Sequence, residues 1–576
     1  MSRDAPLDPI TLEVVRNALS STADEMALVL MRSAYSPVVR DTMDYSTALC
    51  DRNGRIVAQG LTLAVQLGSF PTMMRHLRDE HADTTRPGDV FIANDPYGYG
   101  GQHLPDIYVV KPIFVDDELE GYAATLAHHA DVGGIAPGSI AVHATEIFQE
   151  GLRLPLLKLH DGGVENTDVL RIIEKNTRQP TQVLGDIQAQ VAACRAGERG
   201  LSLLVERHGP DIRAYLERLQ DSAERAMRAE IAALPDGTYR AVDHVDGFGD
   251  DPEPIEIHVA LTVRGDELEI DFTGTTAQVD ASLNCPLGLI HAACYCAIRG
   301  VTRADIPNCE GYMTPIRVVA PEGTVVNPVL PAACGARGVI GYRVYDAIMR
   351  ALAEVVPERV VAAGEGGPTL VALGGYDAQR RPFGTTEVIV GAWGARATRD
   401  GLEGVSNPLA NLSNQPIELL ESDLPLEVVR YALVPDSGGP GRHRGGLAYE
   451  REYRVRAGRA TLTIRTDRRL HPPYGLDGGL PGGTSLNTAT IRGSEQDVPP
   501  MPMSALTLSR GDRFRHRSAG GGGSGSPLSR DPAAVLRDVR DGKVTIAAAR
   551  EIYGVAVTGE PPHVDDEATA ALRAAR

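Results

Sequence analysis

The chain has 576 residues, of which 43% are hydrophobic and 23% charged, a composition that excludes a mostly disordered protein. The formal net charge is −19, and a surface this acidic repels nucleic acid and anionic membranes, so neither is expected as a partner. With 61 glycines and 39 prolines, the sequence predicts many tight turns.

The cysteines and the apolar segments indicate the cellular compartment. Seven cysteines, mostly in apolar surroundings, favour a reducing environment with free thiols. The N-terminal residues lack a basic stretch followed by an apolar run, so no signal peptide is expected. No uncharged apolar stretch reaches the roughly 18 residues of a membrane-spanning helix. We therefore expect a cytoplasmic protein.

The first quarter of the chain predicts a helix, a hairpin and then buried strands. Asp8 can cap a long amphipathic helix that starts with the following proline. Asn53-Gly54 separates two apolar runs within residues 45–65, which is typical of a hairpin. Between residues 89 and 151, short apolar runs alternate with segments rich in Gly, His and Asp. That texture indicates buried strands whose ends carry polar loops.

The remainder is first helical and then strand-rich. Residues 166–234 read as helices, and Pro235 ends that run. Further on, an Arg-Gly-Asp turn at 264–266 predicts a second hairpin, and residues 288–301 and 339–356 predict buried helices. The last dozen residues are expected to fray.

The predicted fold class is therefore α+β, in a mixed chain of several domains. Residues 1–235 form an N-terminal region that carries the candidate metal ligands, and residues 236–516 form a strand-rich body. Residues 517–530 are glycine-rich and predict a flexible or backbone-ligating linker. Residues 531–576 form a helical C-terminal tail.

The densest cluster of possible metal ligands lies between residues 41 and 150. His103 and Asp106 are three residues apart with a stiffening proline between them, and His128 follows an apolar strand and precedes two glycines. Asp44 can complete a set of four, with Asp41 as an alternative close by. Imidazole and carboxylate ligands at the ends of adjacent strands suit Zn, Mn or Fe. The sequence thus predicts a divalent metal site.

Several neighbouring groups allow more than one interpretation. His129 should point to the opposite side of the strand from His128, so only one of the pair is expected as a direct ligand. Asp131 shares the side of His129. Glu146 and Glu150 would share one face if their segment is helical, and a solvated helix face is then the alternative to a functional role.

Other motifs are absent or weak. The chain has no phosphate-binding loop, no Gly-x-Ser-x-Gly elbow and no His-Glu-x-x-His. The glycine-rich runs at 478–483 and 520–523 do not follow a clear strand and open a helix, so tight turns or linkers explain them. For His291, Cys294 and Cys296, buried packing in a helix is a better interpretation than metal binding.

Five segments, in order over nearly the whole chain, resemble the hydantoinase B/oxoprolinase family. They are ANDPYGYGGQHLPDIYVV (93–110), LAHHADVGGIAPGS (126–139), ATEIFQEGLRLP (144–155), YEREYRV (449–455) and RDPAAVLRDVRDGKVTIAAAREIYGVAV (530–557). The resemblance implies the B-type subunit of an ATP-dependent enzyme that opens a cyclic amide: a hydantoin, 5-oxoproline or another lactam. It also implies an A-type partner subunit that binds ATP and activates the amide by phosphorylation.

The resemblance also bears on individual residues. The family's metal is held by an Asp, a His-x-x-Asp pair and a further His, and the matching residues here are Asp44, His103, Asp106 and His128. Candidates for proton transfer or for supporting the ligands are His129, Asp131 and Glu150.

This chain departs from the family pattern in places, and those departures leave the substrate open. Gln102 precedes the His-x-x-Asp pair where Thr is usual, the run at 40–43 is less charged than usual, and the glycine run near 520 lacks its usual aromatic neighbour. Two alternatives remain: the metal-bearing subunit of an ATP-dependent acetone- or acetophenone-type carboxylase, and a subunit that only scaffolds an ATPase partner.

Overall fold

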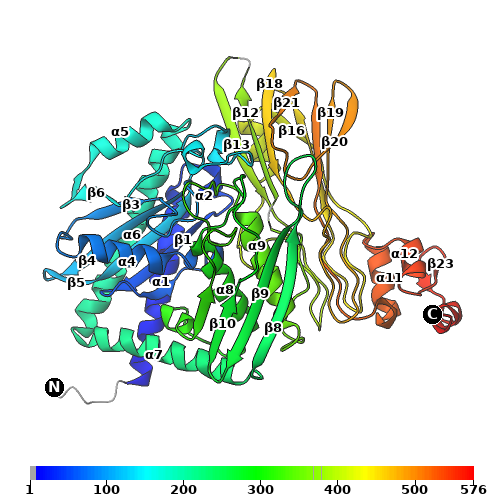
Figure 1. The fold of residues 1–576 in the computed structure, drawn as a ribbon, viewed down its shortest axis with the longest axis horizontal. Coiled ribbons are helices and arrows are strands. Elements are labelled where there is room, and N and C mark those ends of the chain that lie inside the picture. Colours follow the sequence, from blue (N-terminus) through cyan, green and yellow to red (C-terminus); the bar gives the residue numbers. More distant parts are fainter. Residues whose placement is uncertain (1–7, 368, 378) are drawn as a thin grey trace.

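A computed structural model describes residues 8–367, 369–377 and 379–576, and the α+β class with several packed units is confirmed (Figure 1). Residues 1–7, part of the segment in which no signal peptide is expected, lie outside the described residues. Among the helices that the structure describes, none is long and apolar enough to cross a membrane.

The N-terminal unit is a seven-stranded sheet between two helical layers. The strand order is β2-β1-β5-β4-β3-β6-β7. Helices α1 and α6 cover one face, where Leu49 and Val109 join their core, and α4 covers the other face through Phe70. The elements are α1 (Pro9–Ser33), α2 (Pro37–Arg40), β1 (Tyr45–Asp51), β2 (Ile56–Gln59), α3 (Ala64–Leu67), α4 (Phe70–His81), β3 (Val90–Ala93), β4 (Asp106–Val115), β5 (Glu118–His128), η1 (Pro137–Ser139), η2 (Ile147–Gln149), β6 (Leu157–Asp161), β7 (Val164–Glu165), α5 (Thr167–Asn176), α6 (Pro180–His208) and α7 (Asp211–Ala232).

The predicted elements of this unit are confirmed. The Asp8 carboxylate accepts the backbone N–H groups of Ile10 and Thr11 at the start of α1, as a cap should. β1 and β2 form the expected antiparallel hairpin, and Gly54 donates to the carbonyl of Asp51 in its turn. Helices α5, α6 and α7 account for the helical segment predicted at residues 166–234.

One edge of this sheet brings the candidate ligands together. β4 begins at Asp106, β5 ends at His128, and these two residues are paired directly across the antiparallel ladder. β1 pairs with β5 so that Tyr45 lies opposite Ala127, which leaves Asp44 at the same edge. The strand register therefore places chemistry-bearing residues that are far apart in the sequence on a common edge.

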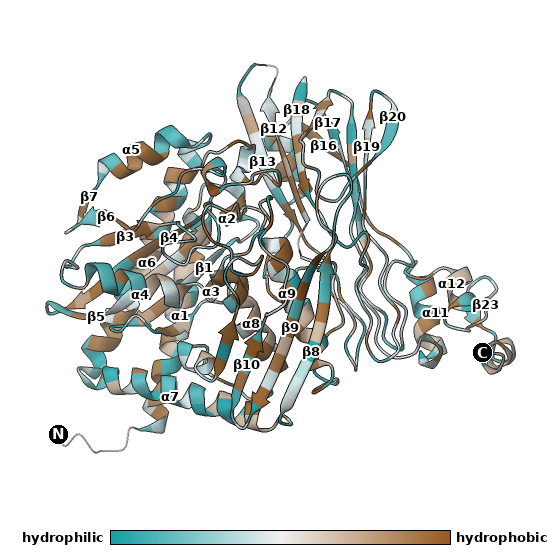
Figure 2. Cartoon of the chain, in the orientation of Figure 1, coloured by the Kyte–Doolittle hydropathy of each residue, from teal (hydrophilic) through white to brown (hydrophobic). Residues whose placement is uncertain are grey.

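The middle of the chain forms a four-stranded sheet against two buried helices. The order is β11-β10-β9-β8, and β9 and β10 form the second predicted hairpin. Helices α8 and α9, both predicted, pack on this sheet and are strongly apolar (Figure 2). The elements are β8 (Gly237–Val245), β9 (Ile255–Arg264), β10 (Glu267–Asp271), α8 (Leu287–Val301), η3 (Glu310–Met313), β11 (Ile316–Val319) and α9 (Gly338–Leu352).

Two further sheets pack face to face to form a sandwich. Their orders are β13-β12-β18-β21 and β16-β17-β22-β19-β20, and residues such as Leu462 and Phe514 fill the space between them. The elements are β12 (Thr369–Tyr376), β13 (Pro382–Ile389), β14 (Gly391–Ala392), β15 (Glu403–Val405), α10 (Ile417–Asp423), β16 (Leu426–Leu433), β17 (Tyr449–Val455), β18 (Arg459–Arg465), β19 (Leu486–Ile491), β20 (Ser494–Val498), β21 (Leu506–Ser509) and β22 (Arg513–Arg517).

The glycine run at 520–523 differs from the expected flexible linker. Its residues are buried, and the N–H of Gly522 donates to the carbonyl of Ala363 at 2.8 Å. A Cβ on Gly522 would lie 1.9 Å from the carbonyl oxygen of Tyr474. The run packs as bare main chain against the other glycine-rich run at 478–483, since side chains would keep these backbones apart.

The C-terminal tail is helical as predicted, but the expected fraying of its last dozen residues is wrong. The carboxylate of Asp565 caps α13, and Arg573 on α13 donates to the carbonyl of Arg530 at 2.6 Å. These bonds anchor the end of the chain to the start of the tail. The elements are η4 (Pro527–Ser529), α11 (Pro532–Arg540), α12 (Ile546–Glu551), β23 (Val557–Thr558), β24 (His563–Val564) and α13 (Asp566–Ala574).

Candidate metal centre

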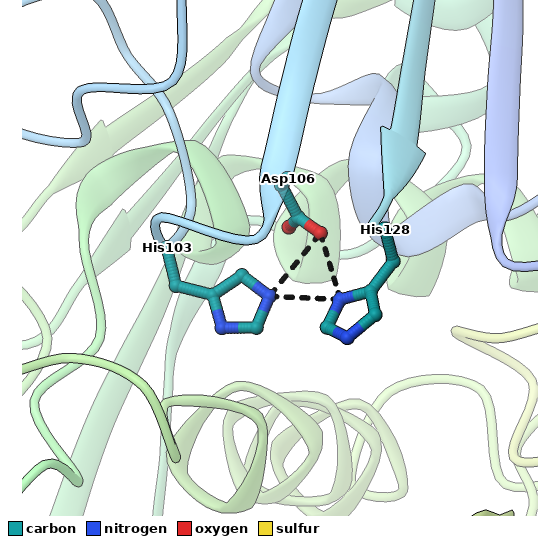
Figure 3. A group of neighbouring side chains, drawn as sticks. All are labelled: His103, Asp106 and His128. Atoms are coloured by element: carbon teal, nitrogen blue, oxygen red, sulfur yellow. Dashed lines mark hydrogen bonds and ion pairs between the residues drawn. The ribbon is translucent and has the colours of Figure 1, made fainter. Parts of the chain in front are cut away.

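His103, Asp106 and His128 converge in the interior of the protein (Figure 3). Nε2 of His103 lies 3.2 Å from Oδ1 of Asp106 and 3.0 Å from Nδ1 of His128, and that Nδ1 lies 3.1 Å from the same Oδ1. All three residues are buried. Within the described residues, this is the only group of three or more His, Cys, Asp or Glu side chains that could hold a metal ion.

The local sequence explains how the three side chains meet. Asp106 and His128 face each other because they are register partners at the ends of β4 and β5. His103 lies in the turn that leads into β4, where the N–H of Asp106 donates to its carbonyl at 3.0 Å. Leu104, between them, is fully buried and fixes this turn in the core.

The protonation states suit a cation. Nδ1 of His103 lies 3.1 Å from the carbonyl oxygen of Gly335 and donates to it, which turns the lone pair of Nε2 toward the other two ligands. Burial, with a further contribution from Arg337, lowers the pKa of His103 to about 3, so the ring is neutral. Burial alone would raise the pKa of Asp106, but His103 and Arg337 hold it well below its usual range. Two imidazoles and one carboxylate therefore present lone pairs.

The spacing of the three donor atoms fits a single divalent ion. The atoms lie 3.0–3.2 Å apart. Bonds of about 2.0–2.2 Å to nitrogen and oxygen set neighbouring ligand atoms roughly 3.0–3.4 Å apart around one ion. An ion could thus reach all three with shifts of a few tenths of an ångström.

Asp44 lies beside this group but outside it. Its carbonyl oxygen accepts the N–H of His128 at 3.0 Å, while Oδ1 of its side chain accepts from Gln66 at 2.9 Å. Burial raises the pKa of Asp44 to about 6. Asp44, His103 and His128 line one small cavity of about 50 Å³. Asp41, the alternative, pairs with Arg40 instead.

Arg337 is a component of the site that sequence reasoning missed. Its Nη2 donates to Oδ2 of Asp106 at 2.5 Å and to Oε1 of Gln102 at 3.2 Å. Gln102, a departure from the family pattern, thus contacts the arginine that holds a ligand. Arg465 and Tyr342 line the same small cavity. No local motif connects residues 106 and 337, so only the fold could reveal this contact.

Glu150 supports the group from behind. Its Oε1 accepts the backbone N–H groups of Cys334 at 3.0 Å and Gly335 at 2.6 Å, and Gly335 is the residue whose carbonyl holds His103. Burial raises the pKa of Glu150 to about 7. Its segment forms only the short turn η2, so Glu150 is buried whereas Glu146 is exposed.

His129 and Asp131 are not brought to the group. Nε2 of His129 lies 3.0 Å from Oε1 of Gln190 on α6, on the other side of the strand from the ligands. Asp131 accepts from the backbone of Gly133 and from Nη1 of Arg178 at 2.9 Å each, and so shapes the loop after β5. Neither side chain reaches the three ligand atoms.

The packing interpretation of His291, Cys294 and Cys296 agrees with the structure. Cys294 is buried in the core that surrounds α8, and the ring of His291 stacks on Tyr295. All seven cysteines are free.

The family model of hydantoinase B/oxoprolinase matches residues 8–527. The chain belongs to this family. It is 36% identical, over 98% of both chains, to a D-/L-hydantoinase subunit of Pseudomonas sp. (strain NS671). The solved ATP-dependent caprolactamase of Pseudomonas jessenii superposes with a TM-score of 0.91 at 32% identity, over 99% of this chain and 100% of that one. An acetone carboxylase structure shares the fold, with a TM-score of 0.91 at 21% identity, over 99% of this chain and 83% of that one.

Proposed function

We propose that this protein is the metal-dependent B-type subunit of an ATP-dependent hydrolase that opens a cyclic amide. The observation that carries the proposal is the convergence of His103, Asp106 and His128 in a chain whose full-length relatives are a hydantoinase subunit and a caprolactamase. The substrate would be a hydantoin, 5-oxoproline or another lactam.

The chemistry required supports a metal in this position. An amide is stabilised by resonance, and water is a poor nucleophile at neutral pH. A divalent ion, Zn, Mn or Fe, held by His103, Asp106 and His128 with Asp44 as a fourth donor, would activate water and polarise an oxygen. Arg337 would orient Asp106, and Glu150 would orient His103 through Gly335. We do not include His129 in this set, because Gln190 holds its ring elsewhere.

The protein would work with an A-type partner that binds ATP. The chain has no phosphate-binding loop, while the relatives that span its whole length are named as subunits. Phosphorylation of the amide oxygen on the partner would turn a poor electrophile into a good one. The seven free cysteines support a cytoplasmic location for the complex.

Adjacent histidines provide a matched test. His128→Gln and His129→Gln would each be co-expressed with the A-type partner, and the purified complexes would be assayed for metal content and for ATP-dependent opening of cyclic amides. We expect His128→Gln to lose both metal and activity, whereas His129→Gln keeps its metal. Full metal occupancy in a folded His128→Gln complex would refute the site.

The fold shared with acetone carboxylase supports one second candidate, the metal-bearing subunit of a ketone carboxylase. The two functions differ in the need for bicarbonate. Ring opening of a cyclic amide without bicarbonate would favour the hydrolase, and consumption of a ketone that depends on bicarbonate would favour the carboxylase. A subunit that only scaffolds its partner would show no bound metal.

A further inference from the structure

A cleft of about 580 Å³ separates the N-terminal sheet from the β-sandwich. One wall comes from the end of β5 and the start of α6, and the other from β12, β13 and α10. His128 lines both this cleft and the small cavity that it shares with Asp44 and His103. A ligand in the cleft would thus lie directly against the candidate metal centre.

The charges in the cleft are already balanced within the protein. Arg178 is the only lysine or arginine among the described residues of its lining. Nη1 of Arg178 donates to Oδ2 of Asp131 at 2.9 Å and to the carbonyl of Gly133 at 3.0 Å, and Nη2 donates to the carbonyl of Gly134 at 2.5 Å. The remaining charged group of the lining is the carboxylate of Asp423. A carboxylate on a ligand would therefore meet no cation that is available to pair with it.

The rest of the lining combines apolar surface with hydrogen-bond acceptors. Val38, Phe383 and Leu420 offer apolar contacts. Two buried acceptors in the walls, Oγ1 of Thr386 and Oε1 of Gln415, have no hydrogen-bond partner within the described structure. N–H groups of a ligand would satisfy such acceptors. The volume also exceeds what a bare five- or six-membered ring needs, since sites of about 300–1,000 Å³ hold drug-sized ligands.

We propose that this cleft holds the substituent of the cyclic amide and selects uncharged, apolar-substituted rings over rings that carry a carboxylate. The proposal rests on the proposed function and narrows it, because it disfavours 5-oxoproline, whose ring carries a carboxylate. The selecting features are the paired Arg178, the carboxylate of Asp423 and the apolar walls. The reacting amide would face His128.

The test compares two hydantoins that differ only in charge and apolar character at carbon 5, the 5-benzyl and the 5-carboxymethyl compounds. The complex with the A-type partner would be assayed for ATP-dependent ring opening of each. We expect kcat/KM to be at least about tenfold higher for the benzyl compound, the scale of discrimination that apolar pockets achieve. Equal values, or a preference for the carboxymethyl compound, would overturn the proposal while leaving the proposed function intact.

A pair of variants on α6 locates the selection in the cleft. Gln182 lines the cleft, whereas Gln188 lies on the same helix, exposed and outside the lining. We expect Gln182→Arg to raise kcat/KM for the carboxymethyl compound and to narrow the preference about tenfold, while Gln188→Arg leaves it unchanged. An unchanged preference in a folded Gln182→Arg complex would place the selection elsewhere and refute the proposal.

Calorimetric binding separates this inference from the proposed function. If neither hydantoin is opened, the proposed function fails. Binding of the benzyl compound that weakens in Gln182→Arg but not in Gln188→Arg would still support the cleft as the ligand site. Equal binding by both variants, or no binding to the wild-type complex, would refute it.

Discussion

Arg337 donates from Nη2 to Oδ2 of Asp106 over 2.5 Å, which leaves Oδ1 of the same carboxylate turned toward His103 and His128. The two oxygens of one side chain therefore have separate tasks. One is fixed by a buried guanidinium, and the other faces the imidazoles. Such a carboxylate has little freedom to rotate, so the arginine determines the direction of a ligand that it does not itself resemble.

Removing this guanidinium should weaken metal binding without unfolding the N-terminal sheet. We expect Arg337→Gln to lower the affinity for Zn²⁺ or Mn²⁺ by about 10–100-fold, the usual cost of losing a group that orients a metal ligand. A competition titration with a chelating dye would measure it. Arg317→Gln, at an exposed position on β11, is the control. Unaltered affinity in the Arg337 variant would show that Asp106 needs no such support.

Glu150 and Glu146 should behave differently although they are only four residues apart. Glu150→Gln replaces one of the acceptors for the N–H groups of Cys334 and Gly335 by a donor, which loosens the carbonyl that holds His103. We expect about a tenfold loss of metal affinity, whereas Glu146→Gln, at an exposed position, has no effect. Metal titration and ATP-dependent turnover would both be measured. Equal behaviour of the two variants would refute the positioning role.

The packed glycines predict a sharp contrast in stability. Gly522→Ala forces a Cβ to within 1.9 Å of the carbonyl oxygen of Tyr474, so the backbone must move. We expect a loss of at least about 1–3 kcal/mol in the free energy of unfolding, as for other overpacked sites. At Gly458 nothing lies within 4 Å of the added methyl, and Gly458→Ala should change stability by no more than about 1 kcal/mol. Thermal melts of the two variants would test this.

Glu365 predicts a pH dependence of stability. Burial raises its pKa well above the ordinary range, against a smaller opposing effect of the Gly391 N–H. The folded chain thus holds a proton that the unfolded chain releases above a pH of about 4.3, and stability falls as pH rises, by at most about 1.4 kcal/mol per pH unit. Glu365→Gln carries no such proton. Its melting temperature relative to wild type should therefore rise from about pH 5 to about pH 8, and a constant difference would contradict the shift.

Local patterns predict much of the N-terminal unit because its helices and hairpins depend on neighbours in the sequence. The cap at Asp8 and the Asn53-Gly54 turn are encoded within a few residues. The His103–His128 region is also visible in the sequence, since both histidines adjoin strands that pair with each other. Whether Asp44 joins them remains a prediction.

Other features lie beyond such patterns. Arg337 reaches Asp106 from 231 residues away, through the packing of two units that no local signal relates. The glycine run at 520–523 has the composition of a flexible segment, and only its partners, which also lack side chains, make it a packed one. Composition alone cannot distinguish these two cases, because both need residues without a Cβ.

The close approach of those bare backbones also determines how the C-terminal tail is presented. Figure 1 shows extended segments running side by side from the β-sandwich to the tail, which lies at the far end of the molecule from the N-terminal unit. Carbonyls and N–H groups bond across these segments, so they act as a stiff strut of main chain instead of a tether. The tail is consequently held out at a set distance and angle, and a movement of either end would be transmitted to the other.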